Sequence, residues 1–265
     1  MNAFNLITGA TGGLGSAFAK LLAERGESLI LTGRSEEKLR ALKDSLLEIN
    51  EGLVIEIIPC NLTDEKDRVA LLSAVADVCK TSGHSLYRLI NVAGADIQKS
   101  LAQYTEEKIC FQCRVNFESA VSLSRGAIEL GVKEIVNISS VSGIYPMPYF
   151  AIYSATKSAL TSFSLALREE MKGAGVRVTA VLPGAIPTRD DVKEQIKGQG
   201  LWGKLAAKSP RFVAEQSLKA VAKNKGKTVI GFANKCMNIG TKLIPLPLKL
   251  KFIARRWGKI SKDSF

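Results

Sequence analysis

The chain is poor in the residues that most often bind metals. It has one histidine, His84, and five cysteines, at positions 60, 79, 110, 113 and 236. Cys110 and Cys113 form a CFQC pair on a helical pattern, but no second pair exists to complete a zinc site. An odd number of cysteines is not typical of a disulfide framework. We therefore expect no metal site, reduced thiols and a cytoplasmic location.

Long hydrophobic runs are also missing. No apolar run reaches the roughly eighteen residues that span a membrane. A predicted strand begins almost at the first residue, without the basic and apolar regions of a signal peptide, so we expect none. No linker or repeat divides the chain before about residue 232, and 46% hydrophobic residues suffice for one core. We expect one nucleotide-binding catalytic domain over residues 1–232.

Acidic residues are absent from one long segment. Residues 216–262 contain twelve Lys and Arg but no Asp or Glu, which accounts for the whole net charge of +12. No nucleic-acid motif accompanies these charges, so we expect no nucleic-acid partner. Residues 233–265 therefore form a basic, apolar C-terminal extension. Its segment 239–259 mixes leucines and aromatic residues with lysines and arginines, which suits either packing on a pocket or subunit, or peripheral contact with a membrane.

Two prolines determine the expected shape of this extension. Pro245 and Pro247 interrupt any single long helix, so we expect two short helices at roughly 234–243 and 248–257. We expect these helices to pack near the mouth of the substrate pocket and to leave their basic face in solvent.

The remaining chain alternates short apolar runs with helical patterns. Strands are expected at 4–8, 28–32, 53–60, 87–93, 133–139, 176–182 and 227–231. Helices are expected at 13–25, 35–49, 64–81, 106–130, 152–173 and 210–224. Repeated alternation of this kind predicts an α/β fold with a Rossmann-like, doubly wound parallel sheet of about seven strands and helices on both faces. Ligands of such sheets bind at the carboxyl ends of the strands.

A glycine-rich loop, TGATGGLG, runs from Thr8 to Gly15 between the first strand and the first helix. This arrangement directs backbone N–H groups at a pyrophosphate on a helix N-terminus. The loop therefore predicts a dinucleotide site that includes Gly9, Thr11, Gly13, Leu14 and Gly15.

Tyr153 and Lys157 lie four residues apart in YSATK, on one face of a predicted helix. An ammonium group beside a phenol favours the phenolate and lowers the pKa of the tyrosine from its usual ~10. The pair can therefore act as an acid or base near neutral pH. Ser140 lies thirteen residues upstream, at the end of the apolar run EIVNIS.

Five motifs occur along the chain in this order: TGATGGLG, NVAG (91–94), the serine of ISS, YSATK and PGAIPT (183–188). The same order is found in short-chain dehydrogenases/reductases, and the chain resembles that family from about residue 3 to about residue 230. The resemblance implies that Ser140 donates a hydrogen bond to the substrate carbonyl, that Tyr153 transfers the proton, and that Lys157 holds the nicotinamide ribose. It also implies that Asn116, in RVNFES, positions a water near Lys157, although a polar surface position is the alternative. The implied catalytic residues are Asn116, Ser140, Tyr153 and Lys157.

The cofactor predicted from these motifs is NADP(H). No carboxylate follows the second strand, and the Arg34 guanidinium there suits a 2′-phosphate, as in the NADP-preferring type of the family. The alternative is a solvated arginine, and Gly12 stands where many NADP-binding relatives carry a basic residue. Asn91 has a structural alternative too. The expected cofactor-binding residues are Gly9, Thr11, Gly13, Leu14, Gly15, Arg34, Asn61, Leu62, Asn91, Ala93, Gly94, Tyr153, Lys157, Pro183, Gly184, Ile186 and Thr188.

Two further regions are assigned to the substrate. Residues 189–209 predict a mobile lid, with a plain surface loop as the alternative. Tyr145, Met147, Tyr149 and Phe150 either line an apolar pocket or form core and subunit contacts.

The sequence therefore predicts an oxidoreductase that transfers a hydride between NADP(H) and a carbonyl or alcohol, with ketone reduction as the favoured reaction, in a homodimer or homotetramer. The alternatives are a non-catalytic NADP-binding regulatory or scaffold protein and a membrane-peripheral reductase of lipid-like carbonyls.

Overall fold

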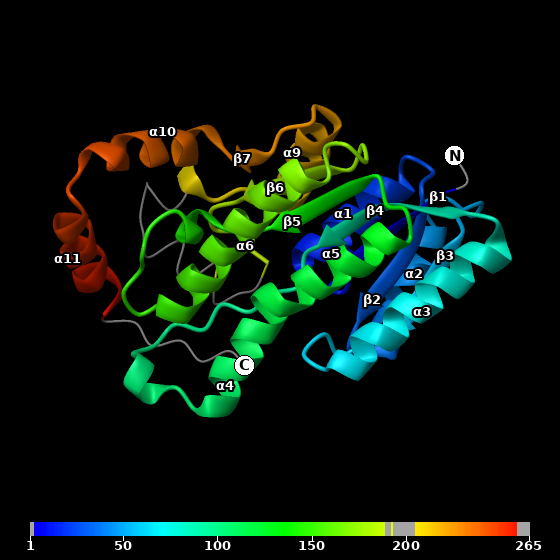
Figure 1. The fold of residues 1–265 in the computed structure, drawn as a ribbon, viewed down its shortest axis with the longest axis horizontal. Coiled ribbons are helices and arrows are strands. Elements are labelled where there is room, and N and C mark those ends of the chain that lie inside the picture. The colour runs from blue at the N-terminus through cyan, green and yellow to red at the C-terminus, as the bar shows by residue number, and fades with distance from the viewer. Residues whose placement is uncertain (1–2, 189–191, 193–204, 259–265) are drawn as a thin grey trace.

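Seven parallel strands form one sheet (Figure 1), in the order β3-β2-β1-β4-β5-β6-β7. The computed structural model describes residues 3–188, 192 and 205–258. The strands are β1 (Ala3–Thr8), β2 (Ser28–Gly33), β3 (Ile55–Pro59), β4 (Ser85–Asn91), β5 (Glu134–Ile138), β6 (Arg177–Leu182) and β7 (Lys227–Val229). This confirms the predicted Rossmann-like sheet. Both faces of the sheet are covered, which explains why central strands such as β2, SLILTG, are buried at every position.

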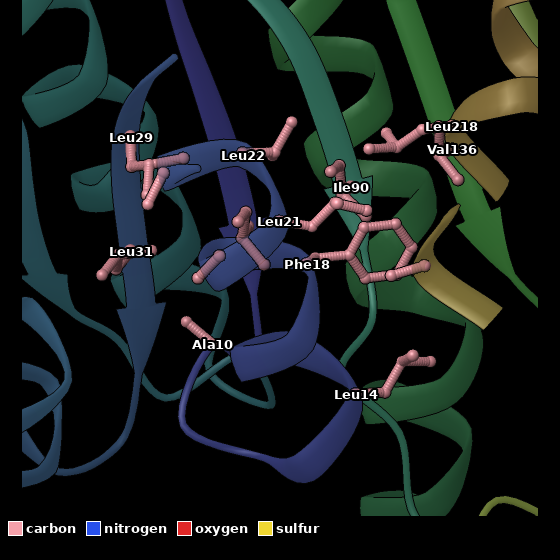
Figure 2. Packing of buried hydrophobic residues seen from close by; sticks show 14 of the residues in the cluster. Ala10, Leu14, Phe18, Leu21, Leu22, Leu29, Leu31, Ile90, Val136 and Leu218 are labelled. Atoms are coloured by element: carbon pink, nitrogen blue, oxygen red, sulfur yellow. The ribbon is translucent and has the colours of Figure 1, made fainter. Parts of the chain in front are cut away.

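Three helices cover one face of the sheet: α1 (Gly13–Ala23), α2 (Glu36–Leu47) and α9 (Pro210–Ala222). Their apolar residues form a core cluster with the strands. Figure 2 shows the ring of Phe18 on α1 next to Ile90 on β4, with Leu218 of α9 and Val136 of β5 close by. Phe18 and Ile90 are both fully buried. This core holds α1 against the sheet, and with it the glycine-rich loop.

The other face carries α3 (Glu65–Ser82), α5 (Ser119–Glu129) and α6 (Ala151–Glu170). A second core cluster, which includes Leu71, Leu123 and Leu167, joins these helices to the strands. Short 3-10 turns, η1 (Leu101–Gln103) and η3 (Val141–Gly143), lie in the connections after β4 and β5. Helix α6 therefore begins close to the carboxyl end of β5.

The helix expected at 106–130 is helical over 106–129, but it contains a π turn that the sequence did not predict. The structure has α4 (Glu106–Cys113), a π-helical turn η2 (Arg114–Glu118) and α5 in its place. Asn116 lies in this π turn, and its buried side chain bonds to the backbone of Ala95. A π turn widens the helix by one residue, so that it can present a side chain that a regular helix would not.

The C-terminal extension contains α10 (Phe232–Gly240), a 3-10 turn η4 (Thr241–Leu243) and α11 (Leu246–Trp257). The two short helices predicted from Pro245 and Pro247 are therefore confirmed. The second begins two residues earlier than expected because Pro247 occupies its first turn, where the missing N–H has no partner to lose. Figure 1 shows α10 and α11 along the outer rim of the molecule, on the side away from β1, β2 and β3. Within the described residues, no helix is long and apolar enough to cross a membrane.

Candidate active site

At the carboxyl end of β1, the backbone of the glycine-rich loop packs closely against the segment after β4 and against itself. Gly9 has a positive φ of 61°, and a Cβ there would lie 3.0 Å from the Cα of Ala93 after β4. A Cβ at Gly15 would lie 2.1 Å from the carbonyl oxygen of Gly9. Only glycine fits either position. The loop leads into α1, whose first turn has no acidic residue and whose N-cap, Gly12, makes no side-chain hydrogen bond. This bare helix N-terminus fits the pyrophosphate of a dinucleotide.

Tyr153 and Lys157 lie on the first turns of α6. The Lys157 Nζ atom lies 5.9 Å from the centre of the Tyr153 ring and donates a hydrogen bond of 2.9 Å to the carbonyl oxygen of Ile138. Lys157 is only 4% exposed. Burial lowers the pKa of this lysine from 10.5 to about 8, against the opposing charge of Asp96. Both groups of the predicted proton-transfer pair therefore lie together, and burial lowers the pKa of the lysine toward the physiological range.

Asn116 holds the surroundings of Lys157 in place. Its Oδ1 accepts a 2.7 Å hydrogen bond from the backbone N of Ala95, and its Nδ2 donates to the carbonyl of Ala95 at 2.9 Å and to Thr156 Oγ1 at 3.2 Å. A Cβ on Gly94 would lie 3.0 Å from Asn116 Oδ1 and 3.1 Å from Lys157 Nζ. The asparagine thus ties the segment after β4 to α6 and brings Gly94 against the lysine.

The two adjacent serines have different environments. Ser139 Oγ bonds to the carbonyl of Lys157 at 2.7 Å and to Thr161 Oγ1 at 2.8 Å, so its hydroxyl is used inside the protein. Ser140 caps η3, and its Oγ accepts a 3.0 Å hydrogen bond from the backbone N of Ser142. No residue in the described part of the chain accepts a hydrogen bond from Ser140. Its hydroxyl hydrogen is therefore available to a hydrogen-bond acceptor outside the described residues.

The surroundings of Asn91 favour the structural role that was the alternative to direct contact with the cofactor. Its side chain is buried and donates a 2.8 Å hydrogen bond to Asn137 Oδ1 on the neighbouring strand β5. Any contact of Asn91 with a nucleotide therefore falls to its backbone. Thr8 was missed by the sequence interpretation, although it opens the TGATGGLG motif. Its Oγ1 accepts hydrogen bonds from the backbone N of Val92 at 3.0 Å and of Ala93 at 3.2 Å, and so orients the strand end that carries Ala93 and Gly94.

The expected adenosine end of the site lies beyond β2 and β3. Arg34 directly follows β2 and is exposed, and no described residue forms an ion pair with it. A Cβ on Gly33 would lie 3.5 Å from Thr11 Oγ1, which places Arg34 next to the glycine-rich loop. Asn61 is exposed, and its Oδ1 accepts a 2.8 Å hydrogen bond from Thr63 Oγ1, whereas Leu62 is buried.

The segment after β6, which begins with Pro183 and Gly184, turns back over the glycine-rich loop. A Cβ on Gly13 would lie 2.6 Å from Thr188 Cγ2, so these two expected cofactor residues are in contact. Ile186 packs against the first core cluster. Asn234 of α10 lies over Gly184 and donates hydrogen bonds to the carbonyls of Ile230 at 2.7 Å and Ala206 at 3.0 Å. No sequence motif marked Asn234.

An apolar wall flanks Tyr153, and α11 supplies part of it. Met147, Phe150 and Ile253 form a small buried cluster, and Tyr145, Tyr153 and Trp257 pack against it. The rings of Phe150 and Trp257 meet edge to face, with centroids 5.5 Å apart. Tyr149 has an unusual positive φ of 65° for a side chain of its size. Of the expected lid, residues 189–191 and 193–204 lie outside the described part of the chain.

Comparisons with known proteins agree with this geometry. A family model described as short chain dehydrogenase matches residues 4–197. An uncharacterised oxidoreductase of Staphylococcus epidermidis is 29% identical over 187 residues, which are 69% of this chain and 77% of that protein. A solved 7beta-hydroxysteroid dehydrogenase has a TM-score of 0.83 and 21% identity, covering 95% of this chain and 96% of its own. A short-chain dehydrogenase from Sphingobium yanoikuyae in complex with NADPH has a TM-score of 0.74 and 25% identity, covering 99% and 98%.

Proposed function

Because the chain belongs to the short-chain dehydrogenase family of oxidoreductases, we propose that it reduces the carbonyl group of an apolar ketone with NADPH. The observation that carries this proposal is the buried Lys157 beside the Tyr153 ring, packed against Gly94 in the segment that contacts the glycine-rich loop through Ala93 and Gly9. A protein that only bound a nucleotide would not need a buried lysine next to a tyrosine, since that burial works against the charge of the lysine.

The proposed proton chemistry follows from the positions of three groups. The Ser140 hydroxyl donates a hydrogen bond to the carbonyl oxygen of the ketone and stabilises the negative charge that develops there. Tyr153 transfers its phenolic proton to the same oxygen, and the Lys157 ammonium favours the phenolate that remains. Asn116 positions this arrangement through Ala95 and Thr156. The nicotinamide cofactor supplies the hydride when bound. In alcohol oxidation the same groups act in reverse.

The preference for NADP(H) is proposed from Arg34. Its exposed guanidinium follows β2, has no ion-pair partner among the described residues, and lies beside the glycine-rich loop. A guanidinium fork suits the 2′-phosphate that distinguishes NADP from NAD. The solved neighbour from Sphingobium yanoikuyae is in complex with NADPH, which agrees with this assignment.

The substrate class is proposed from the apolar wall beside Tyr153. Met147 and Phe150, together with Ile253 and Trp257 of α11, offer hydrocarbon and aromatic surface, so an apolar ketone fits better than a sugar. We keep the remaining sequence expectations as proposals: a catalytic domain over 1–232, a lid over 189–209, an extension over 233–265 and a homodimer or homotetramer, since oligomers are common in this family.

A substrate panel followed by NADPH absorbance tests the proposed function. We expect NADPH-dependent reduction of bulky apolar ketones, with lower kcat/KM for small polar ones. The control is the same panel with NADH. Tight NADPH binding without turnover of any ketone or alcohol would favour the alternative of a non-catalytic nucleotide-binding protein.

A further inference from the structure

The extension leaves many large apolar side chains exposed. Five of them, Phe232, Ile239, Leu243, Leu248 and Phe252, are between 60% and 88% exposed. Most single exposed apolar residues need no explanation, but a group along one rim of a molecule marks an interaction site. The five residues belong to α10, η4 and α11, and these elements run along the outer rim of the ribbon in Figure 1. We call the exposed side of residues 232–256 the rim surface.

The two faces of α11 differ in what they contact. Ile253 and Trp257 face inward and pack on the cluster that contains Tyr153. Leu248 and Phe252 lie one turn apart on the outer side, at 60% and 71% exposure. The inner side supplies the packing that holds this helix on the protein. The apolar side chains on the outer side are therefore not needed for that packing.

The charge of the rim surface has one sign. Lys235, Lys251 and Arg255 are exposed and form no ion pair with any residue in the described part of the chain. The surrounding segment 216–262 has twelve basic residues and no acidic one. A second copy joined face to face through this surface would set these charges against one another, which disfavours self-association. An anionic partner with an apolar interior satisfies both properties at once.

We propose that the rim surface binds the surface of an anionic lipid bilayer, with Phe232, Ile239, Leu243, Leu248 and Phe252 entering the interface and the basic residues contacting the headgroups. Helices with basic residues and large apolar side chains on one exposed side lie in the interface in this way. Each lysine or arginine near such a surface adds to the attraction. The helices lie on the bilayer and do not cross it.

This orientation has a consequence for the active site that rests on the proposed function. The inner face of α11 contacts the Tyr153 cluster, and a helix with its side chains is about 10 Å across. The bilayer surface therefore lies roughly one helix diameter from the catalytic tyrosine. An apolar ketone dissolved in the bilayer is then the substrate class that reaches the site most directly.

Vesicle flotation of the full chain tests the proposal without any need for activity, so its failure is distinct from failure of the proposed reductase function. The probes are vesicles of phosphatidylcholine alone and of phosphatidylcholine mixed with phosphatidylglycerol. We expect binding to the mixed vesicles and at least tenfold less to the neutral ones. Raising NaCl from about 0.1 M to about 1 M, which shortens the Debye length from about 10 Å to about 3 Å, should release the protein.

Two double variants separate the contributions. Leu248→Ser with Phe252→Ser should weaken binding at least tenfold, and Lys251→Gln with Arg255→Gln roughly fivefold for each charge removed. Val69→Ser on α3, whose side chain is 62% exposed, and Lys172→Gln are the matched controls and should bind like the unchanged chain. Circular dichroism and NADPH binding verify that each variant is folded.

Three results would overturn the proposal. The first is no binding of the unchanged chain to the mixed vesicles. The second is equal binding of the rim variants and the unchanged chain. The third is loss of a dimer in the rim variants without any vesicle binding, which would assign the surface to a second copy.

Discussion

At residue 157 the chain places a lysine where burial opposes its charge. The side chain is 4% exposed, and its only hydrogen bond in the described part of the chain is to the carbonyl of Ile138. A pKa lowered from 10.5 to about 8 corresponds to roughly 3 kcal/mol in favour of the neutral form. Stability is therefore reduced at the residue that the proposed reaction needs most, as is common at functional sites.

Lys157→Met should raise the free energy of unfolding at pH 7 while abolishing turnover. The expected gain is roughly 1–2 kcal/mol, because relief of the desolvation exceeds the loss of about 1 kcal/mol from one hydrogen bond. Urea unfolding measures it, with the exposed Lys172→Met as the control.

The pH dependence of this gain has a definite sign. Below about pH 8 both the folded and the unfolded chain keep the Lys157 proton, so the gain of the methionine variant is constant. Between about pH 8 and pH 10.5 the folded chain releases the proton while the unfolded chain keeps it. The penalty in the unchanged chain then shrinks, and the advantage of the methionine variant should fall through zero, because the lost hydrogen bond is then the larger effect. A methionine variant that is less stable at pH 7 would contradict this description of Lys157.

Arg34→Ala should separate the two nicotinamide cofactors. Loss of a charge-assisted contact with a 2′-phosphate costs roughly 1.5–3 kcal/mol, or about ten- to a hundredfold in NADPH affinity. NADH affinity should be nearly unchanged. Arg40→Ala, which removes another exposed arginine of the same region, is the matched control. Equal affinity of the unchanged chain for both cofactors, measured by fluorescence titration, would show that Arg34 does not read the phosphate.

At the scale of elements, local sequence patterns predicted most of the strands and helices. The apolar runs gave all seven strands, and Pro245 with Pro247 gave the two C-terminal helices. The π turn at Asn116 was not predicted, because the residues that Asn116 contacts lie elsewhere in the chain. Asn116 bonds to Ala95 and Thr156, which are 21 and 40 residues away in sequence. The spacing of apolar residues along a helix does not predict such long-range contacts. The contacts of Ile253 and Trp257 with the Tyr153 cluster are long-range in the same way.

Trp257→Ala tests whether α11 forms part of the substrate pocket. The change removes an aromatic wall beside Phe150, so kcat/KM for bulky apolar ketones should fall by roughly tenfold, or about 1.4 kcal/mol. Small ketones should lose little. Phe252→Ala, on the outer side of the same helix, is the matched control in buffer without vesicles. A uniform loss for all substrates, or equal losses in both variants, would assign Trp257 to stability alone.

At the scale of the molecule, the two ends of the parallel strands have different roles. At the amino end of the strands, buried Glu134 on β5 bonds to Arg88 on β4 at 2.6 Å and to Arg177 on β6. This network joins three strands. The candidate active site lies at the other, carboxyl ends of the strands. The motifs predicted which residues meet at that carboxyl edge, because parallel strands bring their carboxyl ends together. They left open whether Asn91 has a structural role, which its buried side chain favours, and they did not predict that Asn234 lies over Gly184.

The most direct test of the proposed reductase is the turnover of Tyr153→Phe with NADPH and a ketone that the unchanged chain reduces. The variant lacks only the hydroxyl group that carries the transferred proton, so kcat should fall by about a hundred- to ten thousandfold. NADPH affinity should stay within about twofold, well under the tenfold that 1.4 kcal/mol would give. Tyr145→Phe removes a hydroxyl from the same apolar cluster and should leave kcat nearly unchanged. A Tyr153→Phe variant that keeps more than about a tenth of the original kcat would contradict the assignment of Tyr153 as the catalytic acid.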